Sequence, residues 1–200
     1  MNQKAIEALR LLEEGNQRFR TGQSAGYRYR SDEIREIGDG QKPFAAVIAC
    51  VDGRVTPEIM FDQRMANLFV SRVPGNVASD SAKWMLELAV SSMHVPLVVV
   101  MGHTNCLAIG QVMRNEPGAG GSLRDDVARA IATADLTNSD DPYREAIRAN
   151  ARHTVEELKL ESAAAREAIV AGELTIVTAV YDVHTGQVEW LDEAKDVLSS

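Results

Sequence analysis

Apolar residues gather in short runs that have the length of β-strands. Residues 44–49 and 97–101 are continuous apolar runs, without the alternation of a half-exposed strand. Such runs are typical of parallel strands that are buried on both faces. Residues 67–73 and 174–183 are two further candidate strands. The second of these is followed by a turn and by a short run at residues 187–191.

Helical patterns lie between and around these strands. Ile6, Leu9, Leu12 and Phe19 recur at helical spacing and predict a helix over residues 3–20 that ends near Gly15 or Gly22. Further helices are expected over residues 79–93, 106–113, 143–160 and 162–173. Strands that alternate with helices predict an α/β fold, with a mostly parallel central sheet flanked by helices.

The chain has no internal repeat and no sign of a second domain. We expect a single domain over residues 1–200, made of an N-terminal helical arm (1–40) and an α/β core (41–200). The N-terminal amphipathic helix is expected to pack on a partner subunit through its apolar stripe. Residues 115–122 are rich in glycine and are expected to form a surface loop.

Composition narrows the classes of function. The net charge is −8 and the pI about 5.0, which argues against general attraction to nucleic acid or to an anionic membrane. No apolar run approaches the ~18 residues that cross a bilayer, and the N-terminus lacks the apolar core of a signal peptide. We therefore expect a cytoplasmic protein. Structural disulfide bonds are rare in cytoplasmic proteins, so we expect the two cysteines to remain available as thiolates.

Three possible metal ligands are expected at one edge of the sheet. Cys50 follows the first apolar run, while His103 and Cys106 follow the run at 97–101. Ligands collect outside the carboxyl ends of parallel strands, so these side chains can converge. One imidazole and two thiolates suit Zn²⁺, and three protein ligands with one open position are typical of a catalytic zinc. Each residue taken singly could equally be structural, since buried cysteines usually act as small apolar side chains.

A charged pair stands beside the first cysteine. Asp52 could bind the metal or accept a hydrogen bond from metal-bound hydroxide, and Arg54 could hold Asp52 by a two-pronged hydrogen bond. That pairing would keep Asp52 ionised. The alternative is an ion pair that only orders the loop. The other histidines, His94, His153 and His184, are expected at or near the surface, where one close to the cleft could pass protons to solvent.

These motifs resemble the β-class carbonic anhydrases. The family pattern C-x-D-x-R is present as Cys50, Asp52 and Arg54, and G-H-x-x-C as Gly102, His103 and Cys106. The resemblance extends over nearly the whole chain and is weakest at residues 110–140. It implies reversible hydration of carbon dioxide to bicarbonate and a proton, through attack of zinc-bound hydroxide. It also implies Zn²⁺ as cofactor, catalytic roles for Asp52 and Arg54, and a homodimer or homotetramer. In a closed form of the site, Asp52 would become the fourth zinc ligand.

Other features of the sequence keep alternatives open. Gln41 stands where some family members carry a substrate-contacting glutamine, although a polar residue before a strand needs no such role. Gly53, Leu107 and Pro74 differ from the residues usual in the family. Gly53 could loosen the loop that holds Asp52 and Arg54, and Leu107 could crowd the pocket. Hydrolysis of carbonyl sulfide or carbon disulfide on the same zinc, or a non-catalytic dimer that binds zinc or an anion, are therefore alternatives.

Overall fold

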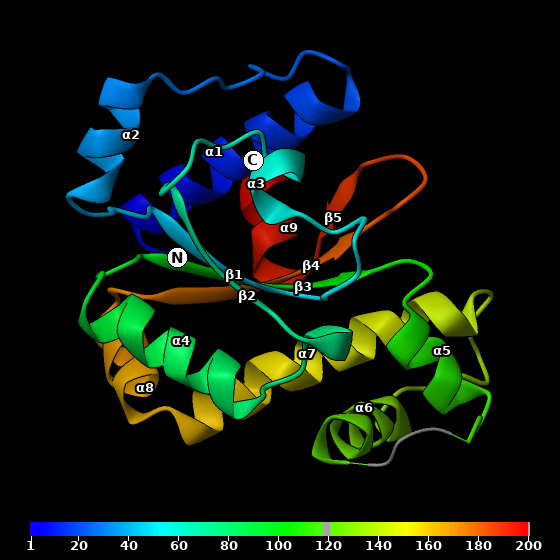
Figure 1. The fold of residues 1–200 in the computed structure, drawn as a ribbon. Coiled ribbons are helices and arrows are strands. Elements are labelled where there is room, and N and C mark those ends of the chain that lie inside the picture. Colours follow the sequence, from blue (N-terminus) through cyan, green and yellow to red (C-terminus); the bar gives the residue numbers. More distant parts are fainter. Residues whose placement is uncertain (118–120, 200) are drawn as a thin grey trace.

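A five-stranded sheet forms the centre of the molecule in the computed structural model, which describes residues 1–117 and 121–199 (Figure 1). The strands are β1 (Ala45–Ala49), β2 (Leu68–Arg72), β3 (Leu97–His103), β4 (Thr175–Tyr181) and β5 (Val188–Trp190). Their order is β2-β1-β3-β4-β5, and only β5 is antiparallel to its neighbour. The expected mostly parallel sheet is confirmed.

Helices cover both faces of this sheet (Figure 1). One face carries α1 (Gln3–Arg20), α2 (Ser31–Gly38), α3 (Pro57–Met60) and α9 (Asp192–Ser199). The other carries α4 (Asp80–Ser91), α5 (Leu107–Met113), α6 (Ser122–Ala132), α7 (Pro142–Glu161) and α8 (Ala163–Val170). Alternate residues of β1 enter the two cores: Ala45, Val47 and Ala49 face the α1 side, and Ala46 and Ile48 face the α4 side. Burial on both faces explains the uninterrupted apolar run.

The strand order changes direction between β1 and β3. The chain leaves β1 toward β2 at one edge of the sheet, and leaves β3 toward β4 on the other side. Two neighbouring parallel strands whose connections diverge leave a crevice at their carboxyl ends, and this is the usual ligand site of an open α/β sheet. The sequence pattern C-x-D-x-R follows β1, and G-H-x-x-C spans the end of β3.

The first helix runs past Gly15 and ends at Arg20, with Thr21 as its C-cap and Gly22 in a left-handed conformation. Gly15 is needed inside the helix because a Cβ there would lie 1.8 Å from the carbonyl oxygen of Phe61. The apolar stripe of this helix was expected on a partner subunit. Within its own chain, Leu9 and Leu12 of this stripe are fully buried in the core between α1 and the sheet.

Four helices were not assigned from the sequence. The segments α2, α3, α6 and α9 have 8, 4, 11 and 8 residues, and three of them are rich in charged side chains. Short polar helices give only a weak periodic signal, so tertiary packing decides them. The expected loop at residues 115–122 gives way to α6 at Ser122, and its residues 118–120 lie outside the described residues. Among the described helices, none is long and apolar enough to span a lipid bilayer.

Candidate metal centre

Cys50 and His103 come from the two strands that border the crevice. Cys50 directly follows β1, and His103 is the last residue of β3. The two strands pair in parallel with Ala49 opposite Met101, so both side chains emerge at the same edge. Gly102 lets α7 approach β3 closely, because a Cβ there would lie 2.8 Å from Cγ2 of Ile147. The imidazole beside it is fully buried.

Cys106 enters the site from the next helix. It is the N-cap residue of α5, three positions after His103. The Tyr143 hydroxyl of α7 donates a hydrogen bond of 2.5 Å to the Cys106 carbonyl oxygen, which fixes the turn that presents the thiol. The loop before it is tied to β4, since the Thr104 amide donates to the Tyr181 carbonyl at 2.9 Å. Helix packing and strand pairing together set the position of this third side chain.

The ligand atoms of Cys50, His103 and Cys106 lie within 4.8 Å of one another, and all three residues are buried. Both cysteines are free thiols, with their sulfur atoms 3.9 Å apart. Two thiolates at about 2.3 Å from a tetrahedral zinc would be separated by about 3.8 Å. The two sulfurs are therefore already spaced as zinc ligands require. Among the described residues, this is the one group of three or more His, Cys, Asp or Glu side chains that could hold a metal ion.

The histidine ring offers a free nitrogen to this group. Its Nδ1 lies 2.8 Å from the main-chain oxygen of Thr104, an acceptor, so Nδ1 carries the proton and donates it. Nε2 is buried and has no hydrogen-bond partner among the described residues. A buried nitrogen lone pair without a partner is costly unless a ligand takes it up. An imidazole whose other nitrogen donates to a carbonyl is the usual arrangement of a zinc-binding histidine. The residues present fit a zinc ion.

The two thiols share their protons unequally. The pKa of Cys50 is lowered to about 4 because the Cys106 thiol hydrogen-bonds its sulfur, and the nearby His103 ring adds to this effect against the cost of burial. The pKa of Cys106 is raised far above its usual range because it keeps the proton that bonds Cys50 and is itself buried. A divalent cation would displace the remaining proton.

Asp52 and Arg54 form the expected two-pronged pair. Arg54 donates from Nε to Oδ1 at 2.9 Å and from Nη2 to Oδ2 at 2.7 Å, and its main-chain amide adds a third bond of 3.0 Å. The guanidinium lowers the pKa of Asp52 far below its usual range, so the carboxylate stays ionised. Arg54 also donates to the Asn105 carbonyl at 3.2 Å and thereby links this loop to the loop after β3. Asp52 does not belong to the group of three converging ligands.

Arg72, at the end of β2, is a site residue that the sequence reasoning missed. Its guanidinium donates to three consecutive carbonyls: Cys50 at 3.1 Å, Val51 at 3.0 Å and Asp52 at 2.6 Å. It therefore fixes the main chain that carries both a thiol and the carboxylate. An arginine in an apolar strand at a sheet edge, as in "LFVSRV", is the signal that could have found it.

An open cleft of about 490 Å³ lies in front of Asp52 and Arg54. Its other lining residues are Asn105, Leu107, Gly110, Arg114 and Tyr143. Leu107, Gly110 and Arg114 share one face of α5, since residues three and four apart on a helix point the same way. The neighbouring face, with Ala108, Gln111 and Val112, lines a different cavity.

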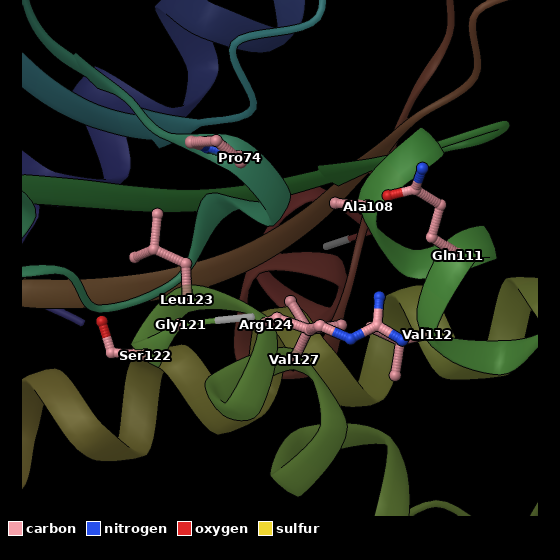
Figure 2. Close-up of a pocket in the computed structure, with 9 residues that line it drawn as sticks. All are labelled: Pro74, Ala108, Gln111, Val112, Gly121, Ser122, Leu123, Arg124 and Val127. Atoms are coloured by element: carbon pink, nitrogen blue, oxygen red, sulfur yellow. The ribbon is translucent and has the colours of Figure 1, made fainter. Parts of the chain in front are cut away.

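That second cavity, of about 350 Å³, is shown in Figure 2. Its lining side chains come from the turn at Pro74, from α5 and from the start of α6. The lining of this cavity contains neither member of the Asp52–Arg54 pair, whereas the cleft contains both.

Four other residues singled out in the sequence lie around this region in different ways. Gln41 is exposed and precedes β1, so the length of the strand separates it from Cys50 in the same chain. Gly53 has open space around it, with nothing within 4 Å of an added Cβ. Leu107 is 66% exposed and lies on the wall of the cleft. Pro74 begins a short 3-10 helix (Pro74–Asn76), where its fixed φ fits the first turn.

Comparison with known proteins agrees with the observed fold. The sequence model of the family described as carbonic anhydrase matches residues 45–188. Carbonic anhydrase 2 of Mycobacterium tuberculosis is 33% identical over 191 residues, which cover 93% of this chain and 92% of that protein. The β-carbonic anhydrase of Coccomyxa, solved in complex with acetazolamide, superposes with a TM-score of 0.72 at 25% identity and covers 89% of this chain and 83% of its own.

A further structural relative has a described assembly. One of two tetrameric β-carbonic anhydrases of the ascomycete Sordaria macrospora superposes with a TM-score of 0.68. It is 20% identical, with 79% of this chain and 85% of that one covered, and so shows likeness of fold. The parallel sheet, the crevice and a Cys-His-Cys group that could hold a metal ion define an α/β enzyme scaffold. This chain belongs to the carbonic anhydrase family, and within it to the β class.

Proposed function

We propose that the protein binds one Zn²⁺ through Cys50, His103 and Cys106 and catalyses the reversible hydration of carbon dioxide to bicarbonate and a proton. The convergence of two sulfurs and an unpartnered imidazole nitrogen within 4.8 Å carries this proposal. Bound zinc would act as a Lewis acid that makes water nucleophilic near neutral pH. Family membership and the curated relatives named carbonic anhydrase support the choice of substrate.

Asp52 is the residue that we expect to orient the attacking water. Its carboxylate is ionised and lies at the mouth of the crevice, where it can accept a hydrogen bond from that water. Arg54 holds it by three hydrogen bonds and so keeps it apart from the thiols. This arrangement corresponds to an open site, whereas a closed form would need the Asp52–Arg54 pair to separate.

The cleft suits a small apolar substrate that becomes an anion. Leu107 presents an apolar side chain to it, and Arg54 and Arg114 present positive charge. Carbon dioxide is apolar and can contact the Leu107 side chain when it enters the cleft. The guanidinium groups attract the negative charge of the bicarbonate product. Because the Leu107 side chain is 66% exposed on the wall of the cleft, we expect it to shape the entrance without closing it.

We further propose that the protein is a homodimer or homotetramer in the cytoplasm. The Sordaria macrospora relatives are tetrameric. In this chain, Leu11, Ile34, Ile59 and Met65 are large apolar side chains that are more than 40% exposed on the layer that holds α1, α2 and α3. We expect a partner subunit to cover these exposed apolar side chains. Strand β1 separates Gln41 from the metal ligands of the same chain. We therefore expect that Gln41 could contact substrate only in the cleft of a second subunit.

Stopped-flow hydration assays test the proposed activity. We expect turnover of carbon dioxide by the wild type and a loss of about 100-fold in kcat/KM for Asp52→Asn, which keeps the shape and removes the charge. Asp192→Asn is the matched control, because Asp192 forms a comparable pair with Arg152 away from the cleft. Parallel assays with carbonyl sulfide and carbon disulfide separate the alternatives. Activity on the sulfur compounds alone would overturn the assignment, and bound zinc without any activity would indicate a non-catalytic role.

A further inference from the structure

Hydration of carbon dioxide releases one proton for each bicarbonate formed, and this proton has to leave the cleft. The following argument rests on the proposed function. Among the described residues that line the cleft, the titratable groups are Asp52, Arg54, Arg114 and Tyr143. One of these, or a group beside them, has to accept the proton if its transfer is to be fast.

None of the lining groups is free to accept this proton. The guanidinium groups of Arg54 and Arg114 stay protonated and accept nothing. The Asp52 carboxylate is already occupied by three hydrogen bonds from Arg54. The Tyr143 hydroxyl already donates its proton to the Cys106 carbonyl. The acceptor has to come from a neighbouring element.

His184 lies beside Asn105, one of the residues that line the cleft. Its Nε2 is 2.9 Å from the side-chain nitrogen of Asn105, and Asn105 lines the cleft together with Asp52. His184 is exposed, in the turn between β4 and β5. The Asp182 carboxylate fixes this turn by accepting from the main-chain amides of His184 and Thr185, at 2.9 Å and 3.0 Å.

The surroundings of His184 allow both protonation states of the ring. The Asn105 side chain can present either its N–H group or its carbonyl oxygen, so it can pair with a bare or a protonated Nε2. The charged groups that face the turn are Asp182, Arg144, which approaches Asp182 at 3.8 Å, and Arg54, which donates to the Asn105 carbonyl. Histidine is the side chain that changes charge between about pH 5 and 8.

We propose that His184 accepts the proton released by hydration and passes it to buffer. After bicarbonate leaves, the water that replaces it loses a proton before the next carbon dioxide is attacked, and this proton reaches the imidazole through solvent in the open cleft. The resulting imidazolium then gives this proton to a buffer base and returns to the neutral ring. Proton transfer to solvent is therefore assigned to a residue outside the Asp52–Arg54 pair and outside the metal ligands.

Steady-state hydration kinetics at low and high imidazole concentration test this role. For His184→Gln, we expect kcat at low buffer to fall by about tenfold or more, because the proton acceptor is lost. The kcat/KM value, which reports conversion of carbon dioxide before the proton leaves, should change by less than about twofold. Added imidazole should restore kcat. His94→Asn is the control, since His94 is also exposed but lies on the turn before β3, at the other end of the sheet.

Two results would overturn the assignment. The first is a kcat for His184→Gln equal to that of the wild type at low buffer. The second is a loss that imidazole does not restore, or an equal fall in kcat and kcat/KM, since either would show that His184 only supports the loop of Asn105. A wild-type protein without hydration activity would instead refute the proposed function, and this inference with it.

Discussion

The guanidinium group of Arg72 donates a hydrogen bond of 2.6 Å to the main-chain carbonyl of Asp52. The same group also reaches the carbonyls of Cys50 and Val51. A residue at the end of β2 thus holds three consecutive peptide groups at the end of β1. The first of them carries a proposed zinc ligand and the third carries the proposed catalytic carboxylate, so the geometry of both depends on this one side chain.

Replacing Arg72 should weaken zinc binding while the fold persists. Arg72→Lys keeps the charge but cannot span three carbonyls, so the Cys50 thiol is less well oriented. We expect zinc affinity to fall by about 10- to 100-fold, as measured by competition with a chelator. The control is Arg166→Lys, because Arg166 also donates to carbonyls, those of Lys159 and Leu160, but at the surface. Unchanged zinc affinity in Arg72→Lys would show that residues 50–52 keep their conformation without the hydrogen bonds from the Arg72 guanidinium.

Two glycines beside the site should differ in how strongly an added methyl group affects stability. Gly53→Ala should leave the free energy of unfolding within about 0.5 kcal/mol of wild type, because the space around it is open. Gly102→Ala should destabilise the fold by about 1–3 kcal/mol, because the Cβ would press on Ile147. Denaturant unfolding measures both changes. A stable Gly102→Ala protein would mean that α7 can move away from β3 at little cost.

The contribution of Glu189 to stability should depend on pH. Burial opposes ionisation of this carboxyl group, but hydrogen bonds from Arg144 and Arg148 outweigh it and lower its pKa. A lowered pKa in the folded state stabilises the fold above the unfolded value of about 4.3, and this stabilisation is lost as the pH falls through the folded value. Glu189→Gln should therefore cost about 1 kcal/mol at about pH 7, since the partners are partly exposed.

This cost should shrink as the pH falls through the folded pKa, below which wild type and variant are both uncharged at this position. Unfolding curves at about pH 7 and at a series of lower pH values measure the difference. Glu7→Gln is the control, because Glu7 is exposed on α1. A difference between wild type and Glu189→Gln that grows in acid would contradict the role given to these two arginines.

Much of the sheet and of the candidate site follows from the sequence. The strands expected at 44–49 and 97–101 are found at Ala45–Ala49 and Leu97–His103, because a continuous apolar run fits burial on both faces. The meeting of Cys50 with Cys106 follows from the same step of reasoning, since both come after neighbouring parallel strands. The Asp52–Arg54 pair could be predicted because its two members are close in the sequence and chemically complementary.

Features that depend on distant contacts were beyond the sequence pattern. Arg72 donates hydrogen bonds to main-chain carbonyls about twenty positions earlier in the chain. The periodicity of apolar residues does not predict such a long-range contact. Gly15 looked like a helix end, but it is a point of close approach to Phe61 inside a longer helix. The helix α6 is short, and its two fully buried residues, Val127 and Ala130, give too small a stripe to reveal it.

Metal analysis of the wild type beside Cys50→Ser tests the central claim most directly. The account predicts about one zinc per wild-type chain and little or none in the variant, because a serine hydroxyl stays protonated near neutral pH and is a poor substitute for a thiolate ligand. Circular dichroism of the variant shows whether the fold persists. Full zinc occupancy in a folded Cys50→Ser protein would contradict the account, because the metal would then be bound by other residues.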